Sequence, residues 1–431
     1  MKIGIIGCGY VFDHYMSTWD WHPDLIIKGV SDSDPTRLSA VTKAYGLNSF
    51  ASNEALLADP EIGIVVNLTG INSHYEVTKA ALKTGKHVYS EKPLTTSLDE
   101  ARRLFSLAEE RGLRLSCAPS NALSDTTQTT WKAVREGAVG DVRVVYAEFE
   151  DNVIYLMQPE TWKSRTGAPW PYLHEYEQGC TVEHVGYHLT SLCAIFGPVE
   201  SVTAFSKLAF PDKTDLHLDP ADTPDFSVAC LNFRSGVVAR VTCSIGTPQD
   251  HRMRIVGNKG MLTANTYRDY RCPVYLETFN QLTLNARKAI SVRRNSLLQW
   301  IFGIGGRKLP PVGNPPKPPA RNWTPRELIA AFKRRELGQQ DKTLGIAELA
   351  RAIKAGRPSF PPHDFTLHLT ELTIAIQNAG MRSKTYEMST TFAPIEPREE
   401  TLNAPFSYAH GRRSCALGKA IDRMITRMHG H

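Results

Sequence analysis

Two segments of the chain carry side chains that can transfer protons. Glu91-Lys92-Pro93 places a carboxylate and an ammonium directly after a short apolar run. Later, Glu183, His184 and His188 fall within one predicted helix, Thr181–Phe196, where residues four apart share a face. An imidazole titrates near neutral pH, as acceptance of a hydroxyl proton requires. The histidine pair therefore favours general base catalysis, whereas Lys92 taken alone resembles an ordinary surface lysine.

The histidine pair has two other interpretations. With Cys180 and Cys193 near it in sequence, it raises the question of a metal site, but neither a third spaced ligand nor an HExxH pattern is present. We predict no metal. Both imidazoles could also be core residues hydrogen-bonded to backbone, an alternative that suits His184 better than His188.

A nucleotide-binding turn is predicted at the N-terminus. Gly7-Cys8-Gly9, continuing into Tyr10 and Val11, follows the strand Lys2–Ile6 and opens a helix, where glycines let the backbone approach a pyrophosphate. Phe12 takes the place of the third small residue of this motif. Asp32 ends the next strand, where a carboxylate can accept hydrogen bonds from the ribose hydroxyls and would repel a 2′-phosphate. The pattern favours NAD over NADP; the alternative is a glycine turn with a solvated aspartate.

The elements that position these residues divide the chain into three parts. Strands and helices alternate through residues 1–120, which predicts an α/β Rossmann domain with a doubly wound parallel sheet. Residues 121–393 predict an α+β domain with a largely antiparallel sheet, interrupted by a Pro/Gly-rich excursion at 303–325. Residues 394–431 form a tail with a basic amphipathic segment. That tail and the apolar stretch near 297–304 suit a packed terminal helix, a partner or an anionic membrane.

Composition excludes several classes of protein. The 431 residues exceed one ordinary domain of roughly 100–200 residues. A net charge of +6 needs no nucleic-acid partner, and no apolar run is long enough for an integral membrane segment. The N-terminus reads as a strand and not as a secretory signal, which favours the cytoplasm. Eight cysteines without a CxxC pair suit reduced, buried thiols.

The string GKHVYSEKP, residues 85–93, resembles the GKHVxxEKP signature of the glucose–fructose oxidoreductase/inositol dehydrogenase (Gfo/Idh/MocA) family. Asn67-Leu68-Thr69 with His74 resembles the family's preceding nucleotide-contact loop. The resemblance implies that Glu91 and Lys92 lie beside the nicotinamide and the reacting hydroxyl, and that the Lys-Pro bond is cis. Lys92 would then donate to the carbinol oxygen. A homo-oligomer, a dimer or tetramer, is implied as well.

The second domain departs from the family pattern Asp-x-Gly-x-His-x-x-Asp. Gly186 and His188 match, while His184 replaces the first aspartate and Ser191 the last. We expect His188 to be the general base and His184 to orient the substrate or relay its proton. Glu183 would contact substrate or reorient one imidazole.

The segment ETWKSRTGAPWPYLHEYEQG, residues 160–179, is dense in aromatic and polar groups. Aromatic faces suit the apolar C–H face of a sugar ring, so Trp162, Trp170 and Tyr172 are candidate substrate contacts. A surface loop anchored by buried tryptophans explains the segment equally well.

Together these features predict an NAD(H)-dependent oxidoreductase that acts on a secondary alcohol of a sugar, sugar nucleotide or cyclitol. Two alternatives stay open. The first is a glycosidase or lyase that recycles NAD through oxidation, elimination and reduction, because His184 supplies an extra acid or base. The second is a non-catalytic nucleotide-binding protein, because both family aspartates are missing.

Overall fold

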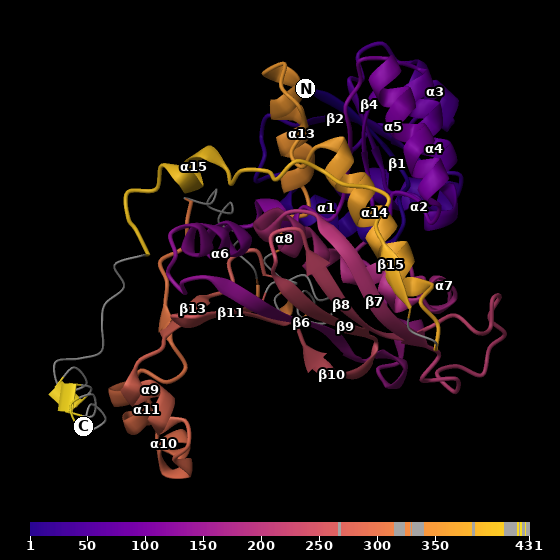
Figure 1. Ribbon diagram of the computed structural model, residues 1–431. Helices are drawn as coiled ribbons and strands as arrows, with labels where there is room; N and C mark the ends of the chain where they lie inside the picture. The colour runs from indigo at the N-terminus through magenta and orange to yellow at the C-terminus, as the bar shows by residue number, and fades with distance from the viewer. Residues whose placement is uncertain are drawn as a thin grey trace.

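Figure 1 shows the chain as a computed structural model in which a compact α/β layer lies above a broad sheet. The structure describes residues 1–265, 269–313, 324–327, 329, 340–381, 384–408, 420, 421, 423, 424 and 427. Most of the predicted basic tail segment and residues 314–323 of the Pro/Gly-rich excursion lie outside this part of the chain.

The first domain has a five-stranded parallel sheet in the order β2-β1-β3-β4-β5. Its strands are β1 (Lys2–Ile6), β2 (Ile26–Ser31), β3 (Ile64–Asn67), β4 (His87–Ser90) and β5 (Leu115–Cys117). Its helices are α1 (Tyr10–Trp19), α2 (Pro35–Tyr45), α3 (Asn53–Ala58), α4 (Ile71–Lys83) and α5 (Leu98–Glu110). Because strand order reverses between β1 and β3, a ligand crevice opens at their carboxyl ends. The predicted Rossmann fold is confirmed.

One helix of this domain comes from far along the chain. α13 (Leu344–Lys354) places Ile346, Ala347 and Leu349 in the same apolar core as Ile5 and Val66 of the parallel sheet. The approach is close, since a Cβ at Gly345 would lie 2.4 Å from the Tyr89 hydroxyl oxygen. α13 lies in the range that the sequence assigns to the second domain, yet its apolar face covers the first.

The second domain is built on a ten-stranded, largely antiparallel sheet in which β6 and β9 run parallel. The path is β14-β13-β12-β11-β6-β9-β8-β7-β15, with β10 paired to β6. The bounds are β6 (Val142–Val153), β7 (Val199–Lys207), β8 (Phe226–Phe233), β9 (Val238–Ser244), β10 (Gly246–Asp250), β11 (Arg252–Gly257), β12 (Gly260–Asn265), β13 (Val274–Thr278), β14 (Arg307–Lys308) and β15 (Thr385–Glu387).

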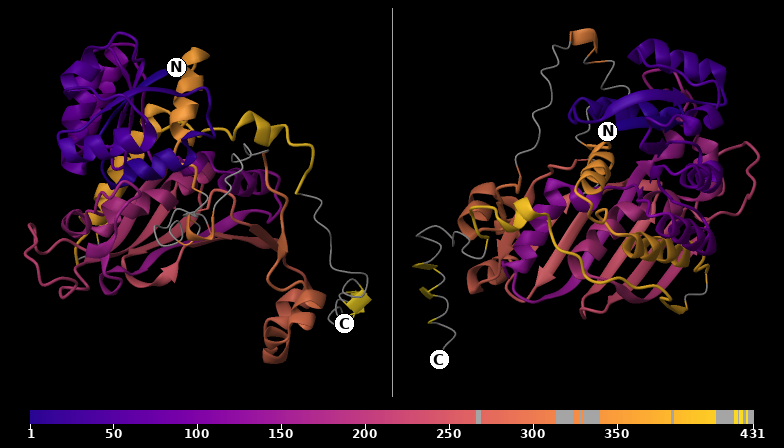
Figure 2. Two further views of the ribbon diagram at one scale, coloured as in Figure 1. Left: turned by 180° about the vertical axis from the view of Figure 1, so that it is seen from behind. Right: turned by 90° about the horizontal axis from the view of Figure 1, so that it is seen from above.

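Helices cover one face of this sheet and join it to the first domain (Figure 2). The covering helices are α6 (Asp125–Arg135), α8 (Gly186–Phe196) and α14 (His363–Gln377). A π-helical segment, η4 (Thr181–Val185), runs directly into α8 where a single α-helix was predicted. The shorter helices are η1 (Asn121–Leu123), η2 (Ile154–Leu156), η3 (Pro159–Thr161), α7 (Tyr172–Gln178), α9 (Gln281–Ala286), α10 (Ile290–Arg294), α11 (Ser296–Phe302) and α15 (Glu399–Leu402).

No helix in the described part of the chain is long and apolar enough to cross a membrane.

Candidate active site

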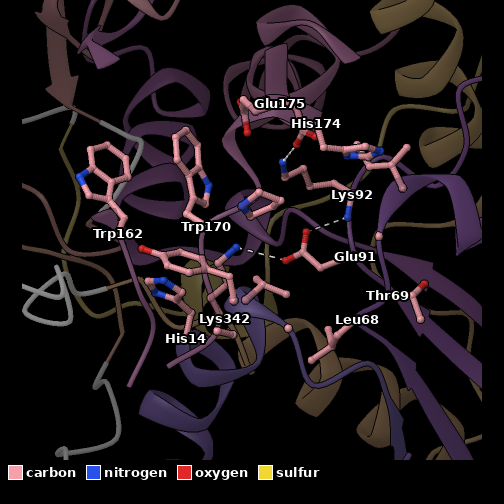
Figure 3. A pocket seen from close by; sticks show the side chains of 18 of the residues that line it. His14, Leu68, Thr69, Glu91, Lys92, Trp162, Trp170, His174, Glu175 and Lys342 are labelled. Carbon is pink, nitrogen blue, oxygen red and sulfur yellow. Dashed lines mark hydrogen bonds and ion pairs between the residues drawn. The ribbon is translucent and has the colours of Figure 1, made fainter. Parts of the chain in front are cut away.

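A cavity of about 400 Å³ lies where the two domains meet. The loops after β1, β3 and β4 form one side of it, and η4, α7 and the loop before α7 form the other. Figure 3 shows Glu91 and Lys92 across the cavity from the paired indole rings of Trp162 and Trp170. The structure thus brings together residues from both halves of the predicted site.

The glycine turn fits the pyrophosphate of a dinucleotide. Gly7 has φ +101°, and a Cβ there would lie 2.6 Å from the backbone of Leu68, so the turn requires glycine. A Cβ at Gly9 would meet nothing within 4 Å, and no side chain caps the N-terminus of α1. Gly9, Tyr10 and Val11 line the cavity. An anion can therefore approach the N–H groups that begin α1.

Phe12, which departs from the motif, and Cys8, within the turn, are both explained by the structure. Phe12 is fully buried in the core of the first domain, with its ring centroid 5.9 Å from that of Tyr45. Burial also raises the pKa of the Cys8 thiol to about 12, with a further contribution from the charge of Asp32. The thiol is therefore protonated at neutral pH, and it is the backbone of Cys8 that shapes the turn.

Asp32 organises the turn through its own carboxylate. Its Oδ2 accepts the backbone N–H of Cys8 at 2.6 Å, and its Oδ1 accepts that of Asp34 at 2.7 Å. Asp32 lies outside the set of described residues that line the cavity, but Arg37 of α2 lines it and pairs with Asp34 at 3.2 Å. Arg37, which belongs to no sequence motif, therefore places a cation close to the predicted ribose site.

Asn67 and His74 position loops. Asn67 is fully buried, donates to the carbonyl of His74 at 3.1 Å, and accepts from the hydroxyl of Thr69 at 2.7 Å. The ring of His74 bridges the carbonyls of Thr69 and Pro93, at 3.0 and 2.6 Å. Thr69 and His74 line the cavity, and Asn67 fixes the loop that carries them. This network ties the β3–α4 loop to the Lys92–Pro93 turn, whose peptide bond is cis.

Lys92 extends from the end of β4 into the cavity and forms an ion pair with Glu183 of η4. Burial lowers the pKa of Lys92, but the negative charge of Glu183, with those of Glu175 and Glu91, outweighs it and raises the pKa well above the usual value. The ammonium thus keeps its proton. It presents a fixed positive charge at the centre of the cavity.

Glu91 stabilises the side of the cavity that carries Lys92. Its carboxylate accepts the backbone N–H of Lys92 at 2.8 Å, the hydroxyl of Tyr15 at 3.0 Å and the ammonium of Lys342 at 3.2 Å. Burial opposes ionisation, but Lys342 and Lys92 lower the pKa of Glu91 to about 2. Lys342 also lines the cavity. It precedes α13 and belongs to no sequence motif, so no pattern in the sequence indicated it.

His184 lines the cavity beside Lys92 and pairs through Nε2 with Glu175 of α7. Although burial raises the pKa of Glu175, the His184 imidazole outweighs it and lowers the pKa. The imidazole also stacks on Phe149, with ring centroids 5.0 Å apart. A carboxylate on one nitrogen of an imidazole fixes its tautomer. Glu175 holds Nε2 of His184, and Nδ1, which is buried without a hydrogen-bond partner among the described residues, is the nitrogen left to accept a proton.

His188 has a different environment. It is 0% exposed, its Nε2 lies 2.7 Å from the backbone carbonyl of Glu148, and it is not among the described residues that line the cavity. The i,i+4 spacing places both rings near Phe149, with centroids 5.0 Å away for His184 and 6.1 Å away for His188. Of the two histidines expected at the substrate, only His184 reaches the cavity, and His188 is a core residue bonded to backbone.

This placement predicts a pH effect on stability. Burial lowers the pKa of His188 to about 4, although the hydrogen bond to the backbone of Glu148 acts to raise it. Between about pH 4 and the unfolded value of about 6.5, the unfolded chain binds the extra proton, so stability falls as the pH falls through this window. We expect protonation linked to His188 to lower the free energy of unfolding by about 3 kcal/mol across this window.

Urea unfolding of His188→Gln across this pH range measures that loss. The variant should show a flatter dependence than the wild-type chain, while His217→Gln, at an exposed position, should match the wild type. Equal slopes in the wild type and His188→Gln would show that His188 is solvated. His368, whose pKa burial also lowers to about 4, contributes to both curves and cancels in the comparison.

The aromatic segment divides into two parts. The ring centroids of Trp162 and Trp170 are 4.8 Å apart, and both indoles line the cavity. Tyr172 packs edge-on against Tyr176 and lies outside the described cavity lining. Thr166 of the same loop donates twice to Asp13 of α1, at 2.7 and 2.9 Å. These bonds hold the indole-bearing loop of the second domain against the nucleotide-binding helix of the first.

Two family models together match more than half of the chain. Residues 1–118 match the family described as an oxidoreductase family with an NAD-binding Rossmann fold, and residues 127–263 match the GFO/IDH/MocA C-terminal domain.

Individual relatives support the same family assignment. The chain is 30% identical to the uncharacterized oxidoreductase YhhX of Escherichia coli over 41% of its own length and 52% of that protein. It is 24% identical to the myo-inositol 2-dehydrogenase of Thermotoga maritima, over 62% of its length and 76% of that enzyme. The chain spans about half the length of the first curated relatives that it matches.

A solved structure shares the fold. An oxidoreductase from Agrobacterium radiobacter, crystallised with NAD⁺, L-tartaric acid and magnesium, superposes with a TM-score of 0.65 and 17% identity, covering 90% of this chain and 98% of that one. The chain therefore belongs to the Gfo/Idh/MocA family of oxidoreductases, with a nucleotide-binding Rossmann domain at its N-terminus.

Proposed function

We propose that this protein is an NAD(H)-dependent dehydrogenase of a secondary alcohol in a sugar, sugar nucleotide or cyclitol. One observation carries the proposal: Lys92 and the His184–Glu175 dyad line the same cavity as the N-terminus of α1. A proton donor, a proton acceptor and a dinucleotide site are thus within one space. Relatives include an inositol dehydrogenase, which supports a polyol substrate.

In this proposal the residues have separate roles. The nicotinamide, when bound, supplies the hydride acceptor, or the donor in the reverse direction. Lys92 donates to the oxygen of the reacting carbinol and stabilises its developing negative charge. His184 takes the hydroxyl proton, and Glu175 stabilises the imidazolium that results. Glu183 and Glu91 hold Lys92 in place, and the indoles of Trp162 and Trp170 pack on the apolar face of the substrate ring.

Mass spectrometry of the denatured protein, followed by a panel of sugars and cyclitols with NAD⁺, tests this function. We expect a co-purified nicotinamide nucleotide and formation of NADH with at least one polyol. Nucleotide binding without hydride transfer across the panel would refute the dehydrogenase and leave the non-catalytic protein predicted as an alternative.

We also propose that the nucleotide is NAD rather than NADP, because the carboxylate of Asp32 repels a 2′-phosphate. Arg37 opposes this preference, since its side chain is 46% exposed and can reach an added phosphate. We expect Asp32→Ser to shift the ratio of NAD to NADP affinities by about tenfold or more toward NADP. Arg37→Ala should weaken NADP binding and leave NAD binding unchanged. Titration of each nucleotide measures both, and an unchanged ratio in Asp32→Ser would contradict the assignment.

A second candidate is the redox-neutral cleavage of a glycoside, and Glu183 favours it. Burial raises the pKa of this carboxyl group, while the charge of Lys92 opposes the shift. Glu183 and Glu175 thus have pKa values displaced in opposite directions, as separate acid and base roles require. Release of an aglycone without net NADH would support this reaction, and stoichiometric NADH would exclude it.

A further inference from the structure

Helices α9, α10 and α11 form an arm, residues 281–302, that extends from the β13 edge of the large sheet on the side away from the first domain (Figures 1 and 2). The arm has little core of its own. Its buried side chains are Leu282, Thr283, Ala286 and Val292, and α11 buries none. The active-site cavity lies on the opposite side of the sheet and uses no residue of the arm.

The arm exposes large apolar side chains to solvent. Leu284, Ile290, Leu297 and Trp300 are 45, 65, 61 and 71% exposed. Leu297 and Trp300 are three residues apart in α11 and therefore share one face of that helix. Isolated exposed apolar residues are ordinary, but four of them in so short a segment indicate a contact surface.

The charge of the arm selects the kind of partner. Residues 281–302 contain four basic side chains, Arg287, Lys288, Arg293 and Arg294, and no acidic one. Arg287 pairs with Glu277 of β13. Within the described part of the chain, no carboxylate forms an ion pair with the other three. Two such arms repel each other, which disfavours a contact between the arms of two copies of this chain, and nucleic acid would leave the exposed leucine and isoleucine side chains in water.

We propose that the arm docks on the surface of an anionic phospholipid bilayer. Basic side chains lie at the level of the headgroups, while Trp300 and Leu297 enter the boundary between headgroups and acyl chains. Because the arm stands clear of the body of the molecule, it reaches a flat surface without displacing the catalytic cavity. The protein would then act at the membrane surface.

Co-sedimentation of the full chain with vesicles tests the proposal. We expect binding to phosphatidylcholine vesicles that contain about 30% phosphatidylglycerol, weak binding to phosphatidylcholine alone, and loss of binding at high salt. Arg293→Glu with Arg294→Glu, and separately Leu297→Ser with Trp300→Ser, should each weaken partitioning by about tenfold or more. Leu216→Ser, at another exposed apolar position, should bind as the wild type does.

Retained nucleotide affinity shows that each variant is folded, because the arm contributes nothing to the cavity. A chain that ends at Tyr408 separates the arm from the basic C-terminal segment, and it should still bind vesicles. Loss of binding in that chain with the arm intact would overturn the proposal. So would equal binding to neutral and anionic vesicles, or a dimer that Leu297→Ser with Trp300→Ser dissociates.

Discussion

Alanine in place of Lys92 is expected to lower kcat by about two to three orders of magnitude, as loss of one donor to a developing oxyanion does in other enzymes. Lys92 lines the cavity and is held by Glu183, and surrounding carboxylates raise its pKa. It therefore supplies a full positive charge in a site sheltered from water. Steady-state kinetics with the polyol found in the substrate panel measures the loss.

Removal of Lys92 also leaves Glu183 buried without its partner, which is destabilising in its own right. The double variant Lys92→Met with Glu183→Gln removes both charges at similar volume, so it separates folding from catalysis. We expect it to bind NAD and to remain inactive. Lys79→Ala, at a surface lysine paired with Glu76, should keep full activity. Activity of the double variant near the wild-type rate would refute the role of Lys92.

The Rossmann half of the molecule could be predicted because its constraints are local. Gly7 and Gly9 follow a strand directly, Asp32 ends the next strand, and Glu91-Lys92-Pro93 follow the fourth, so chain order alone places them at one sheet edge. α13 could not be predicted in this position. Its apolar face specifies burial against some partner, and sequence periodicity does not say which sheet provides it.

The site in the second domain could be predicted only in part. The residue types Glu183, His184 and His188 indicated acid–base chemistry, but their assignment depended on regular α-helical spacing. Spacing indicates that the two rings share one side of the helix, and both lie near Phe149, but it does not indicate which ring reaches the cavity: His184 does, and His188 is 0% exposed. Glu175 and Lys342 were missed as partners because ion pairs between distant segments leave no periodic signal.

Glutamine in place of Glu175 tests the dyad, and we expect it to lower kcat by about two to four orders of magnitude. An ionised Glu175 accepts the Nε2 proton of His184 and stabilises the imidazolium. A neutral amide can accept through its oxygen or donate through its nitrogen, so it no longer fixes this tautomer, and it leaves the protonated ring without a counter-charge. Because the dinucleotide site lies at α1, the affinity for NAD should stay within about twofold of the wild-type value.

The control and the double variant decide whether the two residues act as a unit. Glu177→Gln changes the same charge on the same helix, α7, at a position outside the described cavity lining, so its kcat should match that of the wild type. His184→Ala should lower kcat by as much as Glu175→Gln does. The double variant should lower kcat little further, since each substitution removes the same proton acceptor. Fully additive losses would mean that the residues act separately. A kcat for Glu175→Gln within about threefold of the wild type would instead make the pair structural and return the search for the base to Glu183.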